Sequence, residues 1–115
     1  MNRTTSALLG LFALAATTAF AAELKFSVAP GYFEDNPGGK LLGPTHGGVV
    51  EDKAGNLYVT TDTPRGIVVF TPAGKFLKTV GPMRIHGLEI REENGSEFLY
   101  GARPGDHEVV KLRLD

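Results

Sequence analysis

Two histidines occur in the same local setting 40 residues apart: His46 is followed by Gly47, and His86 by Gly87. Imidazole is a common zinc ligand, and three histidines that leave one coordination position open form a catalytic arrangement. Because two ligands alone hold a metal weakly, we expect the third to lie in residues outside this chain. The glycines would let the backbone approach its neighbours closely. The alternative is that both histidines are structural and bond to backbone groups of adjacent strands.

Two arginines beside prolines that recur at the same spacing are candidate binding groups for a substrate carboxylate. A guanidinium can bind a carboxylate through two parallel hydrogen bonds. We expect Arg103, more than Arg65, to have this binding role, and the alternative for both is surface solubility.

Other polar residues indicate turns. We expect Asp62, at the end of a predicted strand, to bond the turn that follows it, and His107 to be a solvated turn residue. The acidic pairs at residues 51–52 and 92–93 occupy matching positions beside two predicted turns. Oxygen-rich loops can hold Ca²⁺, so calcium is a second cofactor candidate, less favoured than Zn²⁺ and than a solvated turn.

Several classes of enzyme and binding protein are not supported, because the sequence lacks the residues or motifs that they need. The chain contains no cysteine, which excludes thiolate zinc sites and thiol nucleophiles. It has no G-x-S-x-G element, P-loop or G-x-G-x-x-G motif to support acyl transfer or nucleotide binding. With 12 basic and 13 acidic residues, its formal net charge of −1 gives no electrostatic case for nucleic acid or an anionic membrane as partner.

Residues 1–21 have the pattern of a signal peptide. Arg3 precedes an uncharged, largely apolar run from Ala7 to Ala16, which is too short to span a bilayer as a stable helix. Small residues at Ala19 and Ala21 then predict cleavage after Ala21. The sequence therefore predicts a secreted or periplasmic product, residues 22–115, with no stable membrane anchor after cleavage.

The elements that must position the histidines are predicted to be strands. Short runs rich in β-branched and aromatic residues alternate with turn signals, and no window keeps a 3.6-residue period. The Asn94-Gly95 pair is the strongest signal for a tight hairpin, since both residues tolerate positive φ. We predict an all-β chain of antiparallel hairpins, with strands over residues 48–51, 56–61, 66–71, 76–80, 88–91, 97–101 and 108–114.

These strands repeat. The His-Gly pair recurs after 40 residues, Pro64 as Pro104 after 40, and Tyr58 as Tyr100 after 42. A period of about 40 residues that contains four strands is typical of a β-propeller blade. The run at residues 66–70 is apolar on both faces, as a strand packed between neighbouring sheets requires.

The stretch PTHGGVVEDKAGNLYVTTDTPRGIVVFTPAGKFLKTVG, residues 44–81, resembles an NHL-type propeller repeat, and the resemblance extends more weakly to residue 115. It implies a first blade at residues 44–81 and a truncated second blade at 82–115. Residues 22–43 would supply an N-terminal strand, at Leu24 to Val28, and a linker. NHL propellers usually close with about six blades, so two blades form an incomplete ring. We expect the remaining blades to be missing from this chain, and the alternative is a subunit that assembles.

Within that family, His86-Gly87-Leu88 resembles a ligand motif of the peptidyl-α-hydroxyglycine α-amidating lyases, which are secreted zinc-containing propellers. The resemblance implies Zn²⁺ held by His46 and His86 in a central channel, a catalytic Arg103, and a small or peptide-derived substrate. The turn that carries a catalytic tyrosine in those lyases reads Asp62-Thr63-Pro64-Arg65 here. Two functions remain open: a metal-dependent, lyase-like enzyme, or a non-enzymatic scaffold that binds a protein or polysaccharide.

Overall fold

The computed structural model describes residues 23–33 and 42–115, and it is all-β with almost no helix. The signal peptide and its cleavage site, predicted within residues 1–22, lie outside the described residues. The described part of the chain contains no helix long and apolar enough to cross a membrane. The strands are β1 (Val49–Glu51), β2 (Leu57–Thr60), β3 (Ile67–Phe70), β4 (Phe76–Val80), β5 (Gly87–Glu93), β6 (Ser96–Arg103) and β7 (Glu108–Arg113), with a short 3₁₀ turn at Pro104–Asp106.

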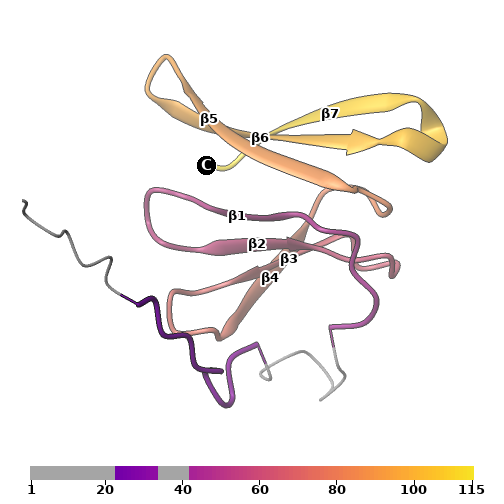
Figure 1. Ribbon diagram of the computed structural model, residues 1–115. Coiled ribbons are helices and arrows are strands. Elements are labelled where there is room, and N and C mark those ends of the chain that lie inside the picture. The colour runs from indigo at the N-terminus through magenta and orange to yellow at the C-terminus, as the bar shows by residue number, and fades with distance from the viewer. Residues whose placement is uncertain (1–22, 34–41) are drawn as a thin grey trace, which may run out of the picture.

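The strands form two antiparallel sheets, stacked one over the other (Figure 1). The first sheet has the order β1-β2-β3-β4 and the second β5-β6-β7, so each strand pairs with its neighbour in the chain. The sequence-based prediction of seven strands in antiparallel hairpins is confirmed. The described residues form no closed ring.

Local turn chemistry explains the longest hairpin. Asn94 and Gly95, with φ of 51° and 83°, form a two-residue connection between β5 and β6. Positive φ at both positions matches the right-handed twist of the flanking strands. Both strands extend further than their apolar runs predict, because the pairs Glu92 with Glu97 and Glu93 with Ser96 continue the ladder through polar residues.

The core lies between the sheets. Tyr58, Ile67 and Val69 of the first sheet pack with Leu99 of the second and with Ile85, all at most 2% exposed. Burying apolar side chains of this size is the main favourable contribution to folding.

The opposite face of the first sheet is covered by the N-terminal segment. Val68 and Phe70 on this face contact Phe33 and Leu42, and the Phe33 and Phe70 rings lie 4.6 Å apart. All four residues of β3 are therefore fully buried, as predicted for a strand that is apolar on both faces.

The N-terminal segment itself forms no strand. Leu24 to Val28 was predicted as one, but these residues are exposed and have no regular secondary structure. An isolated strand lacks hydrogen-bond partners for its backbone, and none lies beside it among the described residues. The segment is held further along, where the Tyr32 hydroxyl donates a hydrogen bond to the Pro72 carbonyl over 2.7 Å.

The β2–β3 pair of the first sheet repeats in register as the β6–β7 pair of the second, whereas the β1–β2 and β5–β6 pairs have different registers. Tyr58 is paired with Val69 across β2 and β3, and Tyr100 with Lys111 across β6 and β7, so both members of the second pair lie 42 residues later. The repeat predicted from the sequence is thus also a repeat of strand pairing, with the counterpart of β4 absent from the described residues.

Candidate metal centre

The two histidines meet at one end of the sheet stack. His46 lies three residues before β1, and His86 immediately precedes β5. The His86 backbone N–H donates to the Ala102 carbonyl over 2.9 Å, which fixes this residue beside β6. The two imidazole rings stack with their centroids 5.3 Å apart and their planes 30° apart. The two histidines that recur in the sequence therefore lie side by side, and their role as metal ligands stays a prediction.

Glycine is needed on the His46 side of this approach. A Cβ built on Gly48 would lie 2.9 Å from the Thr60 side chain and 3.0 Å from the Leu88 side chain of the other sheet. The backbone before β1 can therefore sit close to β5 only without a side chain. The expected close approach at the glycines that follow the histidines is wrong, because a Cβ on Gly47 or on Gly87 would meet nothing within 4 Å. Gly47 is required instead by its φ of 82°.

Asp62 completes the group. Its carboxylate contacts Nδ1 of His46, whereas the sequence suggested that it would bond the following turn. Ligand atoms of His46, Asp62 and His86 all lie within 4.8 Å of one another, and among the residues that the structure describes these three form the group able to hold a metal ion. We call it the His–Asp–His cluster.

The register explains Asp62. Val49 pairs with Val59, and beyond this pair the Asp62 backbone N–H donates to the Pro44 carbonyl over 2.9 Å, which places Asp62 beside the segment that carries His46. The signal was present in the sequence, because residues 46 and 62 are equally far from the centre of the predicted 52–56 turn. Asp62 resembles a turn residue when only its neighbours in the sequence are considered, whereas its contact with His46 arises at the open end of the hairpin.

The cluster is accessible to solvent. The His46 side chain is 66% exposed and that of Asp62 is 23% exposed. Ligand atoms on one tetrahedral zinc ion, each about 2.0 to 2.1 Å from the metal, lie about 3.3 Å apart. The three side chains must close by roughly 1.5 Å from the 4.8 Å limit to bind one ion. An exposed imidazole can do so by rotation of its side chain.

The contact between Asp62 and His46 has a chemical consequence. A carboxylate on one imidazole nitrogen fixes the tautomer and leaves the other nitrogen to bind a metal. His46 would then present Nε2, with Asp62 as the orienting group. Alternatively, Asp62 itself would be the third ligand. Both arrangements leave at least one coordination position for water or substrate.

Arg103 ends β6, next to Ala102, which holds His86. Its guanidinium is paired with Glu108 and, over 2.6 Å, with Asp106, and Nε donates to the Met83 carbonyl over 3.2 Å. The side chain is only 18% exposed. A substrate carboxylate would have to displace one of these acids, so the catalytic role of Arg103 stays a prediction.

The remaining sequence candidates lie in turns. Arg65 donates from Nε to Thr63 over 3.4 Å, beside the first-sheet turn. His107 ends the 3₁₀ turn with φ of 55° and is exposed, in agreement with a solvated turn residue.

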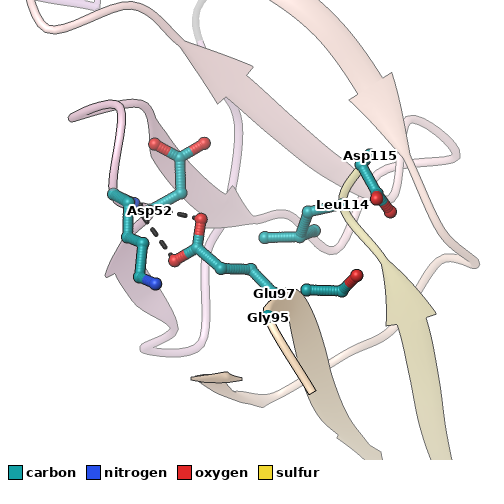
Figure 2. Close-up of a pocket in the computed structure, with 7 residues that line it drawn as sticks. Asp52, Gly95, Glu97, Leu114 and Asp115 are labelled. Carbon is teal, nitrogen blue, oxygen red and sulfur yellow. Dashed lines mark hydrogen bonds between the residues drawn. The ribbon is translucent and has the colours of Figure 1, made fainter. Parts of the chain in front are cut away.

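The acidic pair at residues 51–52 lies near a cavity at the opposite end of the stack, about 230 Å³ in volume, which Figure 2 shows. Asp52 accepts hydrogen bonds from the backbone N–H groups of Ala54 and Asn56 and from the Tyr58 hydroxyl. Burial would raise the pKa of Asp52, but these bonds and one from the Asn56 side chain outweigh it, and the pKa is lowered. Its oxygens thus serve the turn.

The second acidic pair is similarly engaged. Glu92 is bound to the Lys53 side chain, and Glu93 to Tyr100 and, over 2.6 Å, to Lys111. These carboxylates have cationic or hydroxyl donors as partners, which accounts for them without a calcium ion.

No family model matches the chain, and neither a curated protein nor a solved structure matches it.

Proposed function

We propose that this chain is a metal-binding part of an exported NHL-type β-propeller, in which the His–Asp–His cluster holds a zinc ion. The observation that carries the proposal is the convergence of His46, Asp62 and His86, within 4.8 Å of one another, from residues 16 and 40 positions apart. Two imidazoles and a carboxylate are a ligand set that suits zinc and that catalytic zinc sites use.

Support for the propeller comes from the register repeat of 42 residues and from the face-to-face stacking of consecutive sheets. Each sheet of such a fold is one blade, and the residues that begin the innermost strands meet at the axis. His46 and His86 stand at such positions before β1 and β5.

The chemistry that fits is that of a Lewis acid with an open coordination position, which would polarise an oxygen of a small or peptide-derived substrate. A lyase-like reaction is the activity that the family resemblance implies. Arg103, 18% exposed and next to the residue that holds His86, is the candidate to bind a substrate carboxylate.

Metal analysis tests the proposal. The mature chain, purified without chelator, should contain one equivalent of zinc per chain, and the zinc should be lost in His86→Ala. The matched control is His107→Asn, which changes the histidine outside the cluster to a residue that tolerates its positive φ. A metal-free wild-type protein that does not take up added zinc would contradict the proposal.

The alternative, a scaffold without enzymatic activity, is favoured by one feature. The outer face of the second sheet has a broad hollow of about 610 Å³, lined by Tyr100, Val109 and charged residues of β5. Such a face could receive a protein or polysaccharide, with the histidines in a structural role.

A further inference from the structure

Polar contacts fasten the two sheets together at one end of their interface. The Lys53 backbone N–H, in the turn after β1, donates to both carboxylate oxygens of Glu97 on β6, over 3.1 and 3.2 Å. The Lys53 ammonium also contacts Glu92 on β5. Figure 2 shows Glu97 reaching toward the turn at Asp52. This end of the interface is therefore closed by groups from both sheets.

The middle of the interface is apolar. Tyr58 and Val69 of the first sheet pack against Leu99 of the second, with no more than 2% exposure. Apolar packing of this kind is strong but has no direction, so it does not fix how far the sheets open at their edges.

The His–Asp–His cluster lies at the other end. His46 and Asp62 belong to the first sheet, before β1 and after β2, whereas His86 begins the second. Its side-chain contact across the sheets is the stacking of two imidazoles, with ring centroids 5.3 Å apart. Stacking of two aromatic rings adds little to the stability that their burial supplies.

We infer that a metal ion bound at this cluster connects the two sheets. The occupied site would then be a second polar connection between them, at the end of the interface opposite the Lys53–Glu97 contact. The inference rests on the proposed function, because it requires that the ion take ligands from both sheets. An ion held in this way must lose His86 before the second sheet can open away from the first, so its binding free energy opposes that opening. The site then controls the rigidity of the interface as well as any chemistry.

Amide hydrogen exchange of the mature chain with added zinc tests the inference. Some amides of the wild-type protein exchange only when the sheets open and the metal dissociates. Zinc at about 100 times its dissociation constant should slow the exchange of these amides by about 100-fold. We expect this slowing at amides of β5, β6 and β7 as well as of β1 and β2. The imidazole nitrogen resonances of His46 and His86 should both shift on zinc addition, while those of His107 should not.

Variants distinguish the contribution of the Lys53–Glu97 contact from that of the metal site. Glu97→Ala removes the acceptor for Lys53 and should speed exchange in β5 to β7, and zinc should restore most of the lost protection. His86→Gln leaves His46 and Asp62 on the first sheet, so zinc should no longer protect β5 to β7. His107→Asn should behave as wild type in both respects, and circular dichroism establishes that each variant is folded.

The outcomes distinguish the inference from the function on which it rests. Zinc that binds the wild-type chain but shifts one histidine of the cluster alone, or protects only β1 to β4, overturns the inference and leaves metal binding intact. The inference is also overturned if zinc still protects the amides of β5 to β7 from exchange in His86→Gln. A chain that binds no zinc in a titration overturns the proposed function and the inference together.

Discussion

Asp62 has two possible roles in the His–Asp–His cluster: it binds the metal itself, or it orients His46. Its carboxylate touches Nδ1 of His46 and is only 23% exposed, so it cannot simply turn into solvent. Asp62→Asn keeps the shape but removes the charge. Loss of an orienting carboxylate typically weakens metal binding 10- to 100-fold. We expect a loss in that range in a calorimetric zinc titration, and a larger loss for His86→Ala.

His107→Asn is the control for this prediction, because His107 is exposed and outside the cluster. An affinity for zinc that is unchanged in Asp62→Asn would show that the carboxylate neither binds nor orients a ligand.

Tyr58 links the core to the turn before β2. Its ring is 2% exposed, and its hydroxyl donates to the Asp52 carboxylate over 3.1 Å. Burial first, and then the Asp52 bond and charge, raise the pKa of Tyr58 to about 12. A raised folded-state pKa means that the unfolded chain ionises first as pH rises, so this stabilisation is complete below about pH 10 and declines between 10 and 12.

Tyr58→Phe should therefore lower the free energy of unfolding by about 1 kcal/mol at pH 7, through loss of one hydrogen bond. The difference between variant and wild type should shrink as pH rises above 10. Urea unfolding at pH 7, 10 and 11 measures both effects. A difference that stays constant across this range would be inconsistent with the raised pKa.

At the level of the elements, the hairpin between β5 and β6 depends on backbone conformation more than on contacts. Gly95 has φ of 83°, and a Cβ there would meet nothing within 4 Å. Gly95→Ala should therefore cost about 1 to 2 kcal/mol from the left-handed conformation alone. Gly105→Ala is the matched control, because Gly105 has equally open space without a positive φ. Chemical denaturation compares the two, and equal stabilities would contradict the argument.

The strands show what sequence can and cannot predict. The Asn94-Gly95 turn and the apolar runs are local signals, so seven strands and their pairing order could be predicted. The ends of β5 and β6 could not, because Glu92 and Glu93 look like turn residues until the partner strand is present. Asp62 is a different case: its distance from the 52–56 turn equals that of His46, but the contact between the two side chains arises only at the open end of the hairpin.

Over the whole molecule, equivalent positions of the two sheets have different surroundings. Thr60 and Ile67 are paired in the first sheet and are buried against the second. Ala102 and Val109, 42 residues later, are also paired, but Val109 is 76% exposed. This face is buried in the first sheet, whereas no layer among the described residues covers the equivalent face of the second sheet. Edge strand β7, paired only with β6, borders this face.

An exposed apolar side chain beside an unpaired strand edge favours association, so we expect the mature chain by itself to form oligomers as its concentration rises. Val109→Lys should reduce this association, because a charge in place of this exposed apolar side chain would have to be desolvated in any contact. Val49→Lys is the control, since Val49 is 59% exposed on β1 of the other sheet. Light scattering over a concentration series measures the effect. If the wild-type chain stays monomeric throughout, or if both variants associate equally, the prediction is wrong. The charged side chains of β5 and β7 around Val109 would then be enough to keep this face in water without association.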